Sequence, residues 1–178
     1  MNICIYAAAS EKIDKFFKTK TEDLCEILAK NGHNLVYGAG STGLMGAAAR
    51  GFTKGNGKVV GVTPHFMYEI EPIYDKCTEL IHTETMAERK VEMEQRAEAF
   101  IILPGGIGTF DEFFQCLTLK YLGIFNKEII VYNMNEFYTD LLKYLDKCVE
   151  KKFIGEQVPT MYKIAKTPEE VLQILNNL

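Results

Sequence analysis

Short apolar runs alternate with longer amphipathic stretches along this chain, and this alternation restricts the possible folds more than any other feature. We expect strands at Asn2–Ala8, Asn34–Tyr37, Lys58–Thr63, Thr78–His82, Ala99–Leu103, Glu128–Tyr132 and Tyr162–Ala165. We expect helices at Glu11–Asn31, Gly43–Lys54, Thr85–Glu98, Thr109–Leu122, Asn135–Lys151 and Pro168–Leu178. Apolar strands that alternate with helices are typical of a parallel sheet covered on both faces. The sequence therefore predicts an α/β fold with a doubly wound, Rossmann-like sheet, in which ligands bind beyond the carboxyl ends of the strands.

Length and charge limit the classes of protein to which the chain can belong. Its 178 residues suit one domain spanning residues 1–178, without a linker or a repeat. The 20 basic and 24 acidic side chains give a net charge of −4, which argues against a nucleic-acid binder and against a binder of anionic membranes. No run of about eighteen apolar residues occurs, so we expect no membrane span. We interpret the N-terminus as a first strand rather than a signal peptide.

The cysteines and histidines indicate neither disulfides nor metal ligands. The five cysteines are widely spaced among apolar neighbours: Cys4, Cys25, Cys77, Cys116 and Cys148. Their odd number and the absence of a CxxC pair favour reduced, packed thiols in a cytoplasmic protein. His33, His65 and His82 lack metal-ligand spacing, and we expect each at a turn or a strand end. We find no GxSxG nucleophile motif and no attachment point for a redox cofactor.

The first glycine-rich loop, Gly38-Ala39-Gly40-Ser41-Thr42-Gly43, lies between a predicted strand and a predicted helix. Its GxGxxG spacing is typical of dinucleotide sites, but such sites need an acidic residue at the end of the next strand, and Gly61–Pro64 contains none. The loop also follows the second strand rather than the first. A tight turn with close helix packing is one alternative, and a phosphate or nucleotide contact is the one that we favour.

The second glycine-rich loop, Pro104-Gly105-Gly106-Ile107-Gly108-Thr109, follows the apolar strand AFIIL directly. Its glycines let backbone N–H groups approach a ligand closely, and the next helix presents its positive end to the same place. The loop is therefore a candidate anion site, although it lacks the GK[ST] of a Walker A motif.

Acidic residues at the start of the helix that follows have a structural interpretation. Thr109 and Glu112 have the Thr-x-x-Glu spacing of a capping box, in which each side chain satisfies a backbone N–H group. Taken alone, this pattern favours capping, and Asp111 at the second helical position would mainly complement the helix dipole. Asp111 and Glu112 diverge by roughly 100° around the helix, so they cannot act as a facing pair of carboxylates.

A second capping box, from Thr85 to Glu88, opens the helix after the fourth strand and is followed by Arg89 and Lys90. Cations near a helix N-terminus oppose the dipole, which makes a purely solvated role less attractive. The fourth and fifth strands place this turn beside the second glycine-rich loop. We therefore expect one pocket that combines backbone donors, a carboxylate and one or two cations.

Three motifs together resemble one family. PGGIGTFDE resembles the PGGxGTxxE signature of the LONELY GUY family, the cytokinin riboside 5′-monophosphate phosphoribohydrolases. MAERK resembles the Met-x-x-Arg-Lys segment of that family, and GAGSTGLMG resembles its glycine-rich loop. The similarity runs through nearly the whole chain. The chain departs from the family at Ala7-Ala8-Ala9-Ser10, where a Gly-Ser-Ser turn is common, and at Ala39, where a third glycine is common.

This resemblance implies an N-glycosidase that hydrolyses an N6-substituted AMP to a free base, a cytokinin, and ribose 5-phosphate. It implies that Arg89 and Glu112 are catalytic and that neither a metal nor an organic cofactor is needed. A carboxylate such as Glu112 could stabilise positive charge on the ribose, hold the ribose hydroxyl groups or activate water, and the sequence does not choose among these roles. The implied substrate-binding residues are Ser10, Glu71, Met86, Arg89, Lys90, Gly105, Gly106, Ile107, Gly108, Thr109, Phe110, Asp111, Glu112 and Thr118.

Other functions remain open at this point. One is a broader AMP nucleosidase for which the N6 group hardly matters, and another is a non-catalytic nucleotide-binding or carrier protein on the same fold. Members of the family are often labelled lysine decarboxylases, but the chain shows no lysine in a context typical of pyridoxal phosphate.

The segment from Phe110 to Phe125 is apolar almost all round, which is typical of a helix buried in a core or at a subunit contact. Family members are homodimers, so the resemblance implies a homodimer. The expected partners are therefore a second copy of the chain and a small-molecule nucleotide.

Overall fold

A computed structural model describes residues 1–178, and its seven strands form one parallel sheet. The strands are β1 (Asn2–Tyr6), β2 (Asn34–Tyr37), β3 (Val59–Pro64), β4 (Glu79–Thr83), β5 (Ala99–Ile102), β6 (Glu128–Tyr132) and β7 (Lys163–Ala165). The helices are α1 (Lys15–Lys30), α2 (Gly43–Lys54), α3 (Met86–Arg96), α4 (Ile107–Tyr121), α5 (Thr139–Glu150) and α6 (Pro168–Leu175). The strand order is β4-β3-β2-β1-β5-β6-β7, which confirms the predicted doubly wound, Rossmann-like architecture.

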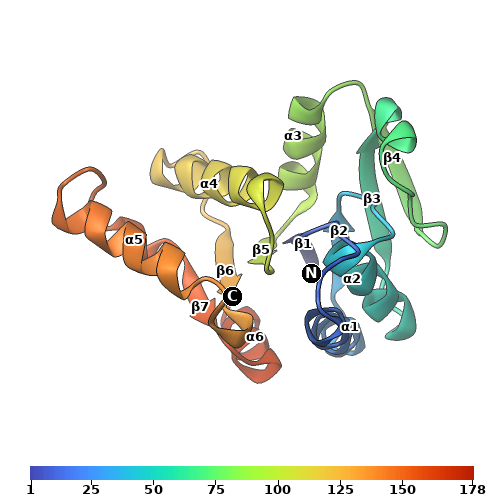
Figure 1. Cartoon of the computed structure of the whole chain (residues 1–178), viewed down its shortest axis with the longest axis horizontal. Coiled ribbons are helices and arrows are strands. Elements are labelled where there is room, and N and C mark those ends of the chain that lie inside the picture. Colours follow the sequence, from blue (N-terminus) through green and yellow to red (C-terminus); the bar gives the residue numbers. More distant parts are fainter.

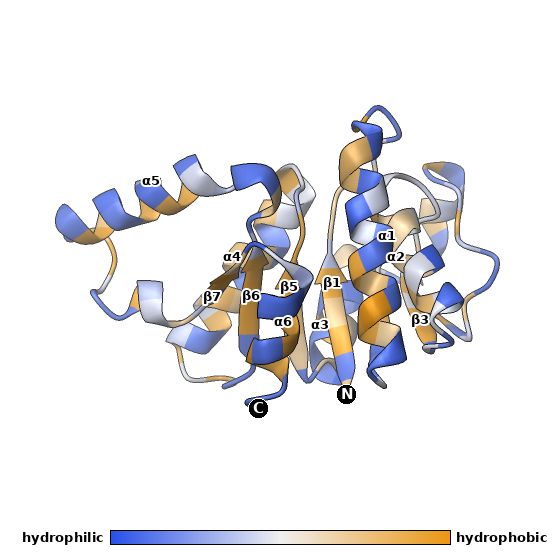
Figure 2. Ribbon diagram, turned by 90° about the horizontal axis from the view of Figure 1, so that it is seen from below, coloured by the Kyte–Doolittle hydropathy of each residue, from blue (hydrophilic) through white to orange (hydrophobic).

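Strand β1 shows how the sheet separates two cores. Ile3 and Ile5 belong to the cluster formed with α1, α2 and α6, whereas Cys4 and Tyr6 belong to the cluster formed with α3, α4 and α5. This alternation follows from the two-residue period of a strand, which points successive side chains to opposite faces. In Figure 1, α3 and α4 lie on one side of the strands, and α1 and α6 lie on the other. The apolar strands run between these more polar helices (Figure 2).

The ends of several elements differ from the expected ones. Helix α4 begins at Ile107 with Gly106 as its N-cap, two residues before the predicted start, and no side chain caps it. The capping box predicted from Thr109 and Glu112 is therefore wrong, and Asp111 is not the second helical residue. Helix α5 begins at Thr139 rather than Asn135, because Asn135 and Glu136 have φ angles of 49° and 59°, outside the right-handed helical region.

Two other expectations concern the helices and the thiols. None of the helices combines the length and the apolar character that crossing a bilayer requires. All five cysteines are free, and Cys4, Cys25 and Cys116 are buried.

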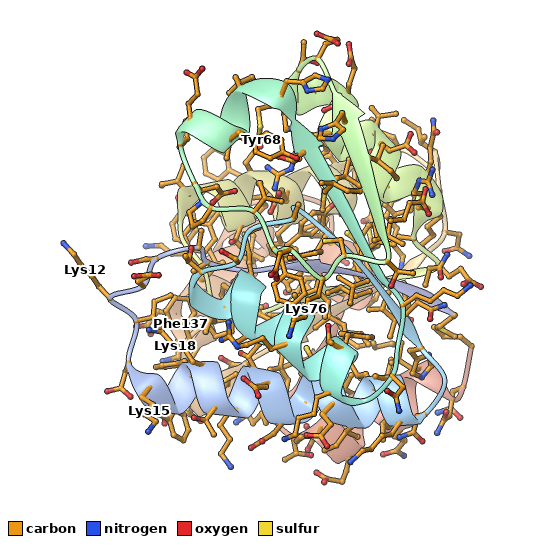
Figure 3. All side chains as sticks on the ribbon, turned by 90° about the vertical axis from the view of Figure 1, so that its right-hand side faces the viewer. Lys12, Lys15, Lys18, Tyr68, Lys76 and Phe137 are labelled. Atoms are coloured by element: carbon orange, nitrogen blue, oxygen red, sulfur yellow. The ribbon has the colours of Figure 1, made fainter.

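The outer end of α1 carries basic side chains into solvent. Figure 3 shows Lys12 pointing outward from the loop before α1 and Lys15 at the start of the helix, whereas the Lys18 ammonium donates to the carbonyl oxygen of Glu11. Phe137 lies beside this end of the helix, with its ring centroid 6.3 Å from that of Phe17. Phe17 and Phe137 also line a small apolar cleft together with Gly105 and Gly106, so this cleft borders the second glycine-rich loop.

The order of the sheet determines where a ligand can bind. Strand β1 pairs with β2 on one side and with β5 on the other. The chain adds β2, β3 and β4 on the first side and then crosses β1 to add β5, β6 and β7 on the second, so the order of the strands reverses at β1. The loops that follow β1 and β5 separate at this switch point, which is where doubly wound sheets form their ligand crevices.

Candidate active site

A cavity of about 370 Å³ opens at the switch point, beyond the carboxyl ends of the strands. The loop after β1, the first turns of α3 and α4, and the segment after β3 each contribute to its wall. The lining residues are Ala7, Ala8, Ala9, Ser10, Met45, Met67, Glu71, Met86, Arg89, Lys90, Gly106, Gly108, Thr109, Asp111 and Glu112. The expected pocket of backbone donors, a carboxylate and cations therefore exists as one cavity.

The first glycine-rich loop serves the fold rather than a ligand. The N–H groups of Leu44 and Met45, at the start of α2, both donate to the carbonyl oxygen of Ala8, at N–O distances of 2.8 and 3.3 Å. The Thr42 hydroxyl donates to the carbonyl oxygen of Ala9 at 2.7 Å. Because the protein itself binds these two amides at the positive end of α2, the contacts favour the tight turn with close packing over the phosphate contact that we expected for this loop.

The second glycine-rich loop leaves its helix N-terminus open. The backbone N–H groups of Ile107, Gly108 and Thr109 donate to no carbonyl or side chain of the protein. Gly106 and Gly108 line the cavity. Gly105 is buried under Thr109, and a Cβ at Gly105 would overlap the Thr109 side chain. No side chain therefore caps this helix end, and three backbone donors remain for a ligand at the positive end of α4.

Glu112 is a half-buried carboxyl in the cavity wall, and it makes no hydrogen bond within the protein. Burial raises the pKa of Glu112 from 4.5 to about 7, and the charge of Arg89 opposes this rise. Because α4 starts at Ile107, Glu112 lies in its second turn, where it caps no backbone group. The carboxyl is thus available to a ligand and can change protonation near neutral pH.

Arg89 is 6% exposed and fixed by main-chain carbonyls. Its Nε atom donates to the carbonyl oxygen of Val62 at 3.0 Å, and its Nη2 atom donates to that of Gly38 at 3.1 Å. These carbonyls lie at the carboxyl ends of β3 and β2. Its Nη1 atom contacts only the Met86 sulfur, at 3.7 Å, which is a weak acceptor. Nη1 therefore donates to no oxygen of the protein and can still donate to a ligand.

Three further charged groups line the cavity, namely Lys90, Asp111 and Glu71. The Lys90 ammonium pairs with the Asp111 carboxylate at 2.9 Å, which joins α3 to α4 beside the cavity. Burial raises the pKa of Glu71, and the charge of Arg89 again opposes the rise. The buried guanidinium of Arg89 thus acts electrostatically on both Glu71 and Glu112.

The structure brings most, but not all, of the expected substrate-binding residues together. Gly105 is buried beneath the Thr109 side chain, Ile107 is 84% exposed, and Phe110 packs with its ring centroid 6.2 Å from that of Tyr138. Thr118 lies farther along α4, where its hydroxyl donates to the carbonyl oxygen of Phe114. These four residues do not line the cavity of this chain.

Sequence reasoning missed several wall residues. Ala7, Ala8 and Ala9 follow β1, and Met45 and Met67 come from α2 and from the 3₁₀ turn η1 (His65–Glu69). The available signal was topological, because residues directly after β1 and β3 must meet at the carboxyl edge of the sheet.

Cofactor and metal chemistry can be tested against the residues present. No three His, Cys, Asp or Glu side chains lie close enough together to hold a metal ion. Lys90 is the lysine that lines the cavity, and its ammonium is held in an ion pair by Asp111. A lysine that forms a Schiff base needs a free amine, so this arrangement does not fit a pyridoxal phosphate site.

Comparisons with known proteins agree with these motifs. A family model described as "Possible lysine decarboxylase" matches residues 45–175. The probable cytokinin riboside 5′-monophosphate phosphoribohydrolase LOGL6 of Oryza sativa subsp. japonica is 34% identical, over 97% of this chain and 69% of that protein. The cytokinin riboside 5′-monophosphate phosphoribohydrolase LOG2 of Arabidopsis thaliana is also 34% identical, over 97% of this chain and 81% of that protein.

Solved structures share the fold at lower identity. The molybdenum cofactor carrier protein of Chlamydomonas reinhardtii superimposes with a TM-score of 0.76 and is 16% identical, over 99% of this chain and 96% of that chain. The molybdenum cofactor binding protein of Rippkaea orientalis superimposes with a TM-score of 0.74 and is 19% identical, over 99% of this chain and 95% of that chain. At such identities the likeness shows the fold alone.

Proposed function

Because this chain belongs to the LONELY GUY family of cytokinin riboside 5′-monophosphate phosphoribohydrolases, we propose that it hydrolyses the N-glycosidic bond of an N6-substituted AMP. The products are the free base, a cytokinin, and ribose 5-phosphate. The observation that carries this proposal is the open N-terminus of α4, which has three unpaired backbone donors and borders the cavity, together with a carboxyl with a pKa near 7 in the next turn of the same helix.

The start of α4 binds the 5′-phosphate in this proposal. The N–H groups of Ile107, Gly108 and Thr109 and the positive end of the helix favour a dianion. Each hydrogen bond to a charged phosphate contributes on the order of 1.5–3 kcal/mol. This binding energy is remote from the bond that breaks, so it orients the ribose and holds the glycosidic bond in place.

Glu112 acts at the sugar carbon. As the C1′–N9 bond breaks, the bonding electrons leave with the base and positive charge develops on the ribose. The Glu112 carboxylate stabilises that charge and accepts a proton from the water whose oxygen bonds to C1′. The departing base takes up one proton from solvent at its nitrogen, and Glu112 returns its proton to solvent, so the products are the neutral base and ribose 5-phosphate. Arg89 provides a fixed cation that interacts with Glu112 and with an incoming anion through Nη1. These steps use side chains and backbone groups of the chain and no cofactor.

We also propose that the enzyme is a homodimer and works in the cytoplasm. Phe114, Leu117 and Tyr121 of α4 line an apolar groove with residues of the α5 end, and Phe153 there is 83% exposed. A second copy of the chain would cover this groove and would also bury Thr118, which lies in it. The five free cysteines suit a reducing compartment.

Incubation of the purified protein with AMP and with isopentenyl-AMP, followed by chromatographic detection of free base, tests this function. We expect free base and ribose 5-phosphate in equal amounts, with isopentenyl-AMP as the better substrate. Equal rates for both nucleotides would instead indicate a broad AMP nucleosidase. Tight binding without release of base, at every pH from 5 to about 9 around the pKa of Glu112, would contradict catalysis and favour a carrier.

A further inference from the structure

The buried position of the Arg89 guanidinium depends on one residue of the first glycine-rich loop, Gly38. The Gly38 carbonyl accepts a hydrogen bond from Nη2 of Arg89, and the α-carbon of Gly38 faces the same guanidinium. A Cβ at position 38 would overlap Nη2 and would lie 2.8 Å from Cζ. No side chain can therefore be added at Gly38 while the guanidinium keeps its place.

The backbone itself does not demand glycine at this position. The glycines with positive φ angles are Gly32, Gly43 and Gly123, and Gly38 is not among them. Alanine can adopt the backbone conformation of Gly38, so its only serious conflict is with the Arg89 side chain and with Cε of Met45, at 3.0 Å. The requirement for glycine thus comes from the arginine rather than from the turn.

We propose that Gly38 is a positioning residue, which acts through Arg89 by leaving the space in which the guanidinium binds the carbonyl ends of β2 and β3. This inference deepens the proposed function and rests on it for its kinetic consequences. The remaining nitrogen, Nη1, keeps its direction only while Nη2 and Nε are held by Gly38 and Val62. A methyl group at position 38 pushes the guanidinium out of this seat and away from the geometry that the reaction needs.

The chain offers a matched control in the same loop. A Cβ at Gly40 would meet Cε of Met45 at 2.9 Å, nearly the same contact as at Gly38, and the Glu71 carboxyl at 3.5 Å, an ordinary van der Waals distance, but it meets no atom of Arg89. Gly40 also lacks a positive φ angle. Gly38→Ala and Gly40→Ala therefore displace the same flexible methionine, and only the first displaces the guanidinium.

The kinetic experiment compares these variants in two backgrounds. Gly38→Ala is expected to unfold near the wild-type temperature and to lower kcat on the order of 10²-fold, the usual cost of a misplaced group, while KM changes less. The kcat of Gly40→Ala is expected to stay about tenfold higher than the kcat of Gly38→Ala. In an Arg89→Lys background, which lacks Nη2, Gly38→Ala is expected to cost no more than about twofold, because the two positions act as one unit.

A pH profile separates positioning from a loss of structure. The charge of Arg89 lowers the pKa of Glu112 against the effect of burial. Moving the guanidinium away should shift the rising limb of kcat/KM to higher pH in Gly38→Ala but not in Gly40→Ala. A Gly38→Ala enzyme with wild-type kcat and pH profile, an equal loss in both loop variants, a full second loss in the Arg89→Lys background, or a failure to fold would each overturn the proposal.

The position of Arg89 can also be decided without catalysis. A crystal structure of Gly38→Ala is expected to show the guanidinium moved from the Gly38 and Val62 carbonyls, and calorimetry is expected to show weaker AMP binding than in Gly40→Ala. If the wild-type protein releases no base, the proposed function fails, but the crystal structure of Gly38→Ala still shows whether Gly38 determines the position of the Arg89 guanidinium. A guanidinium that stays in place while the backbone shifts would reject the role of Gly38.

Discussion

Two glycine-rich loops follow parallel strands at the same edge of the sheet, and they use their glycines in opposite ways. At the end of the first loop and in the first turn of α2, a Cβ at Gly43 or Gly46 would meet backbone atoms within 3 Å, and the amides at the start of α2 already bind Ala8. In the second loop nothing lies within 4 Å of a Cβ at Gly106 or Gly108, and the amides at the start of α4 are unpaired. Glycine therefore makes room for the protein itself in one loop and for a ligand in the other.

The largest expected effect lies in the helix behind the open loop. Glu112→Gln removes the charge and leaves the shape of the side chain, so we expect kcat to fall on the order of 10²–10⁴-fold, the range for a positioned acid–base group. Base release from isopentenyl-AMP measures this effect, and Asp140→Asn, at an exposed site on α5, serves as the control. A Glu112→Gln enzyme with full activity would remove the chemical difference between the two loops.

Substitutions in the first glycine-rich loop, whose helix end is occupied by the protein itself, should lower the free energy of unfolding rather than change the reaction. Gly43 has a φ angle of +57°, and a Cβ there would lie 2.5 Å from the carbonyl carbon of Ala9. Gly43→Ala is therefore expected to lower the free energy of unfolding by roughly 2–4 kcal/mol, through left-handed strain and overlap. Urea unfolding measures the loss, and Gly108→Ala is the comparison in the open loop, with a much smaller change in stability. Equal losses at both positions would contradict the distinction between the loops.

A single backbone donor can be removed from the open loop. Ile107 is the first helical residue of α4 and is 84% exposed, and proline is well tolerated at the first position of a helix. Ile107→Pro deletes one unpaired N–H group, so we expect kcat/KM for AMP to fall roughly 10–100-fold, the worth of one hydrogen bond to a charged group. Adenosine, which has no phosphate, is the control substrate, and its slow turnover should not change. An equal loss for both substrates would show that the amide does not bind phosphate.

The smallest effect is a pH dependence. The folded protein keeps the Glu112 proton up to about pH 7, whereas the unfolded chain loses it near 4.5. The stability that this group contributes is therefore complete below pH 4.5 and is lost as the pH rises through about 7, relative to Glu112→Gln. If the carboxylate is the active form, kcat/KM rises over the same upper range, by about tenfold from pH 6 to pH 8.

Urea unfolding of both proteins at pH 5 and pH 8 tests the sign of the stability change, and a pH profile of kcat/KM tests the active form. A profile that falls through neutral pH would assign the reaction to the protonated carboxyl instead of the carboxylate. A profile without any inflection would remove Glu112 from the chemistry.

The sequence predicted most of the architecture because the pattern of apolar residues is strong. Strands β2 and β6 and helix α2 have the expected bounds, since β-branched runs and flanking glycines mark them clearly. The same sequence misplaced the start of α4. Thr109 and Glu112 have capping spacing, but Thr109 is buried over Gly105, and Gly106 becomes the N-cap.

The candidate site was predictable in composition but not in detail. The motifs brought Arg89, Lys90 and Glu112 to one cavity, as the strand order requires. The partners of Arg89 could not be predicted, because Gly38 and Val62 are 51 and 27 residues away and meet it only through the register of β2 and β3. Motif spacing likewise could not show that Phe110 packs against Tyr138, because that contact depends on where α4 begins.

The guanidinium of Arg89 rests on neutral oxygen atoms and takes part in no ion pair. The charge of an arginine anchored by aspartate would be largely neutralised before any ligand arrived. The carbonyl groups that hold Arg89 instead fix its orientation and leave its full positive charge available to a ligand. Because that charge is 6% exposed, mobile ions from the solvent shield it far less than they shield a surface lysine. Attraction of a phosphorylated ligand should consequently persist at ionic strengths that abolish ordinary surface steering.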